Sequence, residues 1–230
     1  FPLEQIGAYR ILGELGQGGM GKVYKAYHTK LEREVAIKVT LQTRSVSKDV
    51  RERFLNEARL AAKLKHPNIV MIHDVGSIEG VDYMVMEFVE GETLDKMLKR
   101  GRISLKKALE IVRDVASAIA YAHDMGIVHR DLKPANFIMA KKSGYPMVMD
   151  FGLAKRIDVK SGLSHPGEIL GTPVYMSPEQ ACGDSLDHRT DIYSLGATLY
   201  ETLTRRPPFQ GDSYGNVVTQ IMNTDCIPPR

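Results

Sequence analysis

The spacing of hydrophobic and polar residues changes character along the chain. Between residues 9 and 40, apolar and polar residues alternate around glycine-containing turns, which predicts an antiparallel meander. Residues 50–64 instead follow a helical period, with the apolar side chains on one stripe. Two further apolar runs, 69–75 and 81–89, have the composition of strands. The first 89 residues therefore predict a five-stranded antiparallel sheet with one helix.

A polar, glycine-containing break at residues 90–92 precedes a mostly helical pattern. We therefore place a boundary there, between a small lobe of residues 1–89 and a larger, mainly helical lobe of residues 90–230. Two strong helical periods are predicted in the larger lobe, over residues 105–123 and 191–203. Their expected buried faces are Leu105, Ala108, Leu109, Val112, Val115, Ala116, Ile119 and Ala120, and then Ile192, Leu195, Leu199 and Leu203.

Composition narrows the class of protein. With 31 basic and 28 acidic residues and no basic cluster, the chain favours neither a nucleic-acid nor a membrane partner. The apolar runs are far shorter than the roughly 20 residues of a membrane span, and FPLEQIG is not a signal-peptide pattern. Only Cys182 and Cys226 are present, so neither a disulfide framework nor a zinc site is indicated. We expect a cytoplasmic, folded protein.

The segment LGQGGMGKV places Gly16, Gly18 and Gly21 in a G-x-G-x-x-G-x-V pattern. Glycines let backbone N–H groups approach a phosphate where a Cβ atom would intrude, although a tight hairpin explains the same residues about as well. A dinucleotide-binding motif would require a helix after the glycines. Because residues 22–26 continue as a strand, we favour a glycine flap over phosphates instead.

A lysine and a glutamate carry the next signal. The period of two puts Ala36 and Lys38 on one face of a strand, which suits a flat ring with phosphates reaching the ammonium group. The alternative is a solvated lysine on an edge strand. Glu57 lies inside the apolar stripe of its helix, where a carboxylate needs a cation. Lys38 is the candidate, with Arg53 or Arg59 as purely structural alternatives.

The segment HRDLKPAN, residues 129–136, sets five ionisable or strongly polar side chains between two apolar runs. Such groups persist near a core when they are paired, bind a metal or act in a cleft. Asp150 follows the apolar run 147–149 and precedes a Phe-Gly pair. Together with Asp131 and Asn136 it supplies the hard oxygen ligands that Mg²⁺ accepts beside phosphate oxygens.

Together, and in this order, these segments resemble the protein kinase family over nearly the whole chain. The shared motifs are the glycine loop, Val-Ala-Ile-Lys, the helix glutamate, His-Arg-Asp-Leu-Lys-Pro-Ala-Asn, Asp-Phe-Gly and Ser-Pro-Glu at 177–179. The stretches GTPVYMSPEQ (171–180) and TRRPPFQGDS (204–213) are most like the eukaryotic-like, or Hanks-type, serine/threonine kinases of bacteria. The resemblance implies an α+β, bilobal kinase fold with ATP bound between the lobes.

The resemblance also implies the residues that hold the nucleotide. Lys38 would hold the α- and β-phosphates and would itself be held by Glu57. Three glycines would cover the phosphates, apolar side chains would enclose the adenine, and the backbone after the gatekeeper Met86 would bond to it. The implied ATP-binding set is Gly16, Gly18, Gly21, Val23, Ala36, Lys38, Met86, Glu87, Val89 and Ile138.

For the chemical step, the resemblance implies that Asp131 orients and deprotonates the attacking hydroxyl, while Asn136 and Asp150 bind Mg²⁺, with Mn²⁺ as the alternative metal. Lys133 would neutralise charge on the transferred phosphoryl group. Thr172 would bond to Asp131 and Lys133. Lys133 and Thr172 favour protein substrates, and they favour serine/threonine over tyrosine specificity.

Other motif residues are implied to be structural or regulatory. His129 and Phe151 would pack in a hydrophobic spine, and Asp191 would bond the backbone of the catalytic loop. Arg130 beside the catalytic base would await a phosphate on the activation segment, residues 150–179. We favour Ser164 and then Ser161 as acceptors, filled by intermolecular autophosphorylation in a pair of kinase domains.

Departures from the family pattern keep rival hypotheses open. Ser177 replaces the usual alanine. The chain stops at residues 228–230, where kinases continue through further helices, so we expect a truncated large lobe in which Glu179 lacks its usual arginine. A pseudokinase or scaffold is the main rival, and a small-molecule kinase a distant one. In bacterial relatives a membrane anchor often lies outside the kinase domain.

Overall fold

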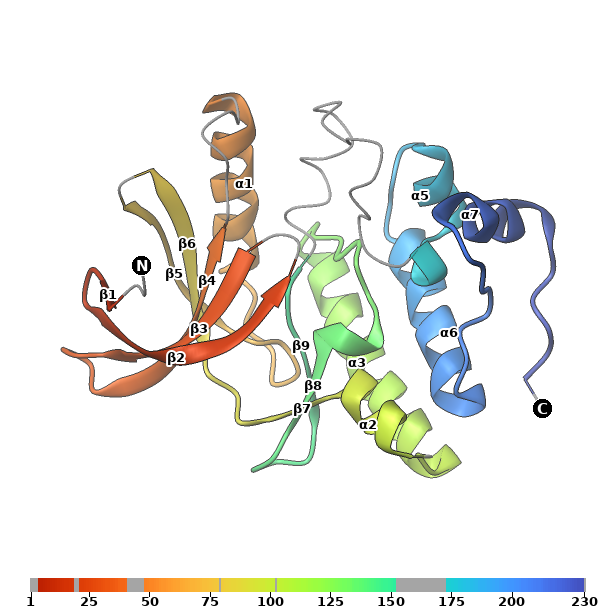
Figure 1. Ribbon diagram of the computed structural model, residues 1–230, viewed down its shortest axis with the longest axis horizontal. Coiled ribbons are helices and arrows are strands. Elements are labelled where there is room, and N and C mark those ends of the chain that lie inside the picture. The colour runs from red at the N-terminus through yellow and green to blue at the C-terminus, as the bar shows by residue number, and fades with distance from the viewer. Residues whose placement is uncertain are drawn as a thin grey trace. The chain divides into compact units, whose positions relative to one another are not determined.

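A computed structural model describes residues 4–18, 21–40, 48–78, 80–101, 103–151 and 173–229 (Figure 1). Internal contacts divide the chain into two compact units. The first comprises Phe1–Lys65 and Val70–Val89, and the second comprises His66–Ile69 and Glu90–Arg230. Among the described helices, none is long and apolar enough to cross a lipid bilayer.

The first unit is an antiparallel sheet with one helix (Figure 1). Six strands pair in the order β1-β2-β3-β4-β6-β5, where five strands were predicted. The extra strand has only two residues, too few to show a period of two, and it turns back through Gly7 at φ +54° so that Ile6 pairs with Tyr9. The bounds are β1 Gln5–Ile6, β2 Tyr9–Gly18, β3 Gly21–His28, β4 Arg33–Thr40, α1 Lys48–Ala61, β5 Ile72–Ile78 and β6 Val81–Glu87.

Alternation along β4 separates the two faces of this sheet. One face carries an apolar core made of Ile6, Tyr9, Ala26, Val35, Ile37, Val39 and Val85. Ala36 and Lys38 belong to the opposite face, because successive side chains of a strand point to opposite sides. The buried face stabilises the sheet, which leaves the other face to present the predicted nucleotide-binding residues.

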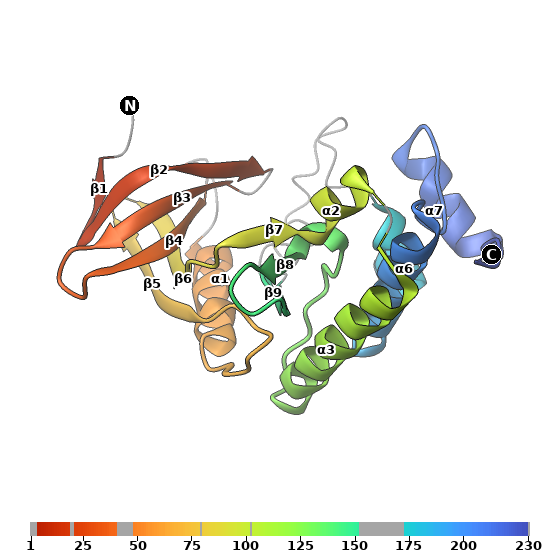
Figure 2. The same ribbon diagram turned by 90° about the horizontal axis from the view of Figure 1, so that it is seen from below.

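The second unit is mainly helical, with a small three-stranded sheet in the order β7-β8-β9 (Figure 2). The short segment 66–69 belongs to this unit because it contacts β9. Ile69 forms a parallel bridge with Val148. The Asn68 carbonyl accepts from the Val148 amide, and the Asn68 side chain donates to the Pro146 carbonyl. The bounds are β7 Gly91–Thr93, α2 Leu94–Arg100, α3 Leu105–Asp124, η1 Pro134–Asn136, β8 Phe137–Ala140, β9 Pro146–Val148, η2 Pro173–Tyr175, α5 Pro178–Cys182, α6 Arg189–Thr204 and α7 Tyr214–Asn223.

The helix α3 begins where Ser104 caps it by accepting a hydrogen bond from the Lys107 amide at 3.2 Å. The predicted buried face was wrong in part, because Leu105 is 61% exposed and Leu109 is 50% exposed. Apolar residues surround so much of this helix that two stripes fit its period. Packing against α6 and β9 selects one of them. The buried residues are Ala108, Ile111, Val115, Ala118, Ile119 and Ala122.

The helix α6 packs against α3 (Figures 1 and 2) but buries polar side chains. The predicted face was wrong here too, since Ile192 is 61% exposed and Leu203 is at the surface. Two of its buried hydroxyl groups donate hydrogen bonds to backbone carbonyls, Thr202 to Thr198 and Ser194 to Tyr175, both at 2.7 Å. The buried residues of α6 are Thr190, Asp191, Ser194, Ala197, Thr198, Tyr200 and Thr202.

Candidate active site

The catalytic-loop segment, residues 128–136, follows α3, ends with η1 and leads into β8. After α3 ends, Gly126 turns the chain at φ +73°, a left-handed conformation that glycine adopts without steric cost. Arg130 has φ +67° and Asp150 has φ +60°, which are unusual for residues with a Cβ atom. Such backbone conformations persist where surrounding contacts hold them, and they cluster at functional sites.

Three polar side chains predicted for the site lie together in this segment. The Asp131 Oδ2 atom is 2.8 Å from the Lys133 ammonium group. Asn136 donates from Nδ2 to the Asp131 backbone carbonyl at 2.7 Å and to Asp131 Oδ2 at 3.2 Å. The carboxylate of Asp131 is thus held at one oxygen by a cation and an amide. The charges of Asp131 and Lys133 are therefore paired.

Asp191, at the start of α6, holds the backbone of the catalytic loop. Its side chain is fully buried, and its two oxygens accept hydrogen bonds of 2.7 Å from the His129 and Arg130 amides. This matches the structural role that the family resemblance implied. The His123 ring, at the end of α3, makes a third contact of 2.7 Å with Asp191. Nothing in the sequence pattern distinguished His123 from any other helical histidine.

The imidazole of His129 is buried and acts as a packing residue. Burial lowers the pKa of His129 below its ordinary value of 6.5, which outweighs the opposite effect of the Asp191 carboxylate. The neutral ring accepts from the Asp131 amide at Nδ1 (3.2 Å), so its Nε2–H donates to the Met149 carbonyl at 3.1 Å. Its ring centroid lies 4.7 Å from that of Phe151, which is also buried. Both residues therefore pack, as the resemblance implied.

The segment after Asp150 is placed only in part. Four motif or site residues of this segment lie outside the described residues: Gly152, the predicted regulatory residues Ser161 and Ser164, and Thr172, which was predicted to bond to Asp131 and Lys133. The chain is described again from η2, where Tyr175 donates a hydrogen bond to Glu201 of α6. Burial raises the pKa of both groups, so the phenol stays protonated and serves as the donor.

In the first unit, the β-sheet register places the nucleotide-binding candidates on a common face. Val23 pairs with Lys38, and Ala36 pairs with Met86, and paired residues of antiparallel strands lie on the same side. Gly16 pairs with Val23 next to an irregularity in β2, and Gly18 pairs with Gly21 at the end of the hairpin. Gly21 has φ +145°, which favours glycine.

The remaining candidates of the first unit are found in α1 and after β6. Glu57 lies in α1 and is half-buried. Its alternative partner Arg59 is exposed and donates to Asn56 at 2.9 Å. The Glu87 amide donates to the carbonyl of Met71, the residue before β5, at 2.8 Å, so this amide already has a partner within the first unit.

Lys25 and Phe88 of the first unit make a contact beside the nucleotide-binding candidates that the sequence did not predict. Lys25 pairs with Ala36 and so shares the face of the nucleotide-binding candidates. Its ammonium lies 4.4 Å from the ring centroid of Phe88, next to Val89, and 2.7 Å from Glu34. A cation over an aromatic face is attractive. This contact tethers the segment after β6, although no local sequence signal links Lys25 with Phe88.

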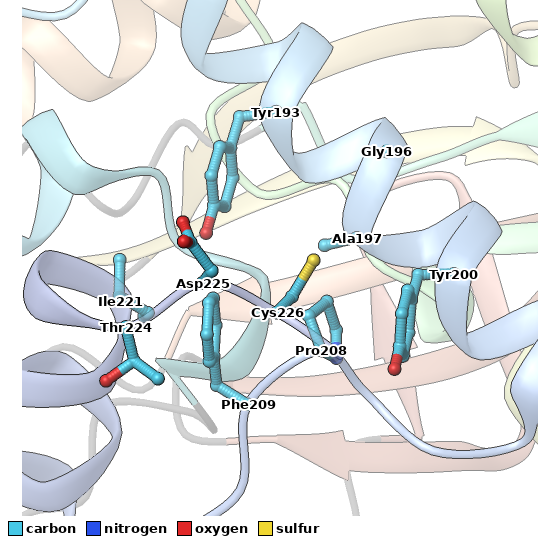
Figure 3. Close-up of a pocket in the computed structure, with 10 residues that line it drawn as sticks. All are labelled: Tyr193, Gly196, Ala197, Tyr200, Pro208, Phe209, Ile221, Thr224, Asp225 and Cys226. Carbon is cyan, nitrogen blue, oxygen red and sulfur yellow. The ribbon is translucent and has the colours of Figure 1, made fainter. Parts of the chain in front are cut away.

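A separate open pocket of about 400 Å³ lies in the second unit (Figure 3). Its lining includes Tyr193, Ala197 and Tyr200 of α6, together with Phe209 and Cys226. Figure 3 shows the Cys226 side chain pointing toward α6. None of the predicted site residues lines this pocket, so it is distinct from the catalytic-loop segment.

Comparison with known proteins defines the class. A model described as "Protein kinase domain" matches residues 9–228. The chain belongs to the protein kinase family. This confirms the predicted family and the bilobal kinase fold, with the strand count corrected as described above.

The relatives are bacterial serine/threonine kinases, as the motifs indicated. Serine/threonine-protein kinase PknB of Mycobacterium tuberculosis is 44% identical over 225 residues, covering 95% of this chain and 36% of that protein. A probable serine/threonine-protein kinase of Clostridium perfringens is 42% identical, covering 96% of this chain and 32% of that protein. The chain thus spans about a third of the length of these curated relatives.

A solved structure shows the same fold. The crystal structure of a point mutant of the Mycobacterium tuberculosis PknI kinase domain superposes with a TM-score of 0.74 and 30% sequence identity. The match covers 90% of this chain and 77% of that chain. Together with the curated relatives, it agrees with the predicted enzyme class, serine/threonine protein kinase.

Proposed function

We propose that this chain transfers the γ-phosphoryl group of ATP to serine and threonine hydroxyls of protein substrates. The observation that carries the proposal is the Asp131 carboxylate, held 2.8 Å from Lys133 and 3.2 Å from the Asn136 amide. A carboxylate fixed beside a cation can accept a hydroxyl proton while the cation faces developing phosphoryl charge. That arrangement is the requirement of phosphoryl transfer by a protein kinase.

In this proposal Asp131 orients the substrate hydroxyl and takes its proton as the oxygen attacks phosphorus. Lys133 offsets negative charge on the transferred group, and Thr172 positions the hydroxyl. Lys133 supports serine/threonine specificity, in agreement with the names of the bacterial relatives. The rival reading of a pseudokinase is disfavoured because Lys38, Glu57, Asp131, Asn136 and Asp150 are all present.

The donor set suits Mg²⁺ held jointly with phosphate. Family members use ATP with a divalent metal ion. Because Asn136 donates both of its hydrogen bonds to Asp131 through Nδ2, its Oδ1 is the atom suited to a metal, and Asp150 adds a carboxylate. Among the described residues no group of three or more His, Cys, Asp or Glu is arranged for a metal ion. Mg²⁺ characteristically relies on one or two carboxylates plus phosphate oxygens, with Mn²⁺ as an alternative, and would neutralise phosphate charge.

The first unit supplies most of the nucleotide-binding residues in this proposal. Lys38 holds the α- and β-phosphates, and Glu57 orients Lys38. The shared sheet face of Val23, Ala36 and Met86 supports an apolar surface for adenine. The backbone of Glu87 and Val89 bonds to the adenine edge, Ile138 contributes from β8, and Gly16, Gly18 and Gly21 cover the phosphates.

Activation by autophosphorylation is the finer part of the proposal. Arg130 lies beside the catalytic base and is the cation that a phosphate on Ser164, or secondarily Ser161, would engage. One kinase domain would phosphorylate another in a transient pair, and the cytoplasm would hold both enzyme and substrates. The motif order supports these assignments.

Intact mass before and after incubation with Mg-ATP tests the function directly. We expect added phosphoryl groups on the parent and none on the Asp131→Asn variant, because the amide cannot accept the hydroxyl proton. Peptide mapping then locates the modified serine. ATP binding without any phosphoryl transfer by the parent would instead favour a pseudokinase. A Ser161→Ala, Ser164→Ala double variant that keeps full activity without a lag would refute the proposed activation.

A further inference from the structure

The peptide group that links Arg130 to the catalytic base Asp131 is held from both sides. The carbonyl of Arg130 accepts a hydrogen bond from Gln180 Nε2 at 2.8 Å. The amide of Asp131 donates to His129 Nδ1 at 3.2 Å. Because this carbonyl and this amide belong to one planar peptide unit, any rotation of the plane disturbs both bonds.

The conformation at this position needs such support. Arg130 has φ +67°, which is sterically unfavourable for a residue with a Cβ atom. Its own amide is held by Asp191 at 2.7 Å. Side chains from α6 and α5 thus hold the two ends of Arg130. Asp191 is the family's structural residue, whereas Gln180 has no role in the motifs considered above.

Gln180 is itself fixed in orientation. Its Oε1 accepts from the Ser177 amide at 3.1 Å, which assigns Nε2 to the Arg130 carbonyl. The Gln180 amide in turn donates to Ser177 Oγ, completing a capping box at the start of α5. Both ends of the carboxamide are therefore used, one for the helix cap and one for the catalytic loop.

Ser177 connects this cap to the helix that carries Asp191. Ser177 is fully buried, and its hydroxyl lies 3.4 Å from Thr190 Oγ1. Thr190 donates to Glu179 Oε1 at 2.7 Å, so Glu179 has a partner within this unit. The start of α5 and the start of α6 are therefore linked through hydroxyl groups. A shift of the Ser177–Gln180 turn would be transmitted to the Arg130–Asp131 peptide.

We propose that Gln180 is a positioning residue for phosphoryl transfer: its carboxamide holds the Arg130–Asp131 peptide and couples the end of the activation segment to the catalytic base. This inference rests on the proposed kinase function. The capping box alone does not require glutamine, because glutamate caps equally well. Only the contact with the Arg130 carbonyl requires a donor at this position.

The difference between glutamine and glutamate provides the test. Gln180→Glu keeps an oxygen for the Ser177 amide and places a negative charge in the first turn of α5, which the helix dipole favours. It replaces the donor with an oxygen facing the Arg130 carbonyl. We expect kcat per nucleotide-binding site to fall about tenfold or more, with KM for ATP changed by less than about twofold. Gln180→Met loses the side-chain contacts with both the Ser177 amide and the Arg130 carbonyl, so its kcat should fall at least as much.

The matched control is Gln220→Glu in α7. Gln220 also donates from Nε2 to a backbone carbonyl, that of Gln210 at 2.6 Å, and neither residue is a predicted site residue. Active sites are counted by calorimetric ADP titration, so that partial unfolding does not imitate a lower kcat. Amide hydrogen exchange should accelerate over residues 127–133 in both Gln180 variants and remain unchanged in the control.

The outcomes separate this inference from the proposed function. Loss of kcat in Gln180→Glu, with normal ADP binding and an active Gln220→Glu control, supports the positioning role. Parental kcat and parental exchange in Gln180→Glu would overturn it and leave glutamine as a helix cap. A parent that binds ADP but transfers no phosphate would refute the proposed function instead, and the hydrogen-exchange comparison would still decide whether Gln180 holds the peptide.

Discussion

The helices α3 and α6 pack against each other, but they bury different kinds of side chain. The inward face of α3 is made of alanine and branched aliphatic residues, which are buried without hydrogen-bonding requirements. The inward face of α6 carries hydroxyl groups and the Asp191 carboxylate, which need partners in a medium that excludes water. Those partners include the catalytic-loop amides. One helix therefore supplies apolar packing, while the other also determines the backbone conformation of the site.

Replacing Asp191 of α6 should have the largest effect on both stability and activity. Asp191→Ala leaves the His129 and Arg130 amides and the His123 ring without their common acceptor. We expect a loss of about 3–5 kcal/mol of unfolding free energy and near-complete loss of activity. Chemical denaturation and a kinase assay measure the two effects. Activity per folded molecule close to that of the parent would show that Asp191 does not position the loop.

Replacing Ile111 should affect stability without affecting the site. Ile111 is fully buried in α3, so Ile111→Ala removes apolar contacts and leaves a cavity. We expect a loss of about 2–5 kcal/mol of unfolding free energy. Because Ile111 takes part in none of the catalytic-loop hydrogen bonds described above, kcat per folded molecule should stay within about twofold of the parent. A large fall in that quantity would place α3 in the machinery as well.

Acidification should destabilise the protein by a smaller amount, through His129 of the catalytic-loop segment. The lowered pKa of His129 means that the unfolded chain binds a proton at a higher pH than the folded chain does. Stability is therefore lost as pH falls below about 6.5, with a slope of at most about 1.4 kcal/mol per pH unit from this group. Denaturation curves between pH 7 and pH 5, about the range of histidine titration, measure this slope.

His129→Phe serves as the reference for that slope. The phenyl ring preserves an aromatic contact with Phe151 and cannot titrate. The parent should lose more stability on acidification than the variant does, and subtraction removes the contribution of other histidines such as His73, whose pKa is also lowered by burial. Equal slopes in the two proteins would assign the pH dependence elsewhere.

Local patterns in the sequence were sufficient for much of the fold. The period of two along β4 correctly separated Val35 and Ile37 from Lys38, because strand geometry alone decides which residues share a face. The helical period located α3 to within one residue at its end. It did not select the buried face of α3 or α6. That choice depends on which neighbour each face meets, as the exposure of Leu105 and Ile192 shows.

The candidate site divides in the same way. The motif HRDLKPAN by itself predicted that Asp131, Lys133 and Asn136 lie close together, because they are at most five positions apart along the chain. The structure shows their contacts. The tertiary structure alone revealed that His123 completes the shell around Asp191, 68 positions away, and that Gln180 bonds to Arg130 across 50 positions. A buried amide or carboxylate must find a partner wherever the fold supplies one, and no local period records which distant residue that will be.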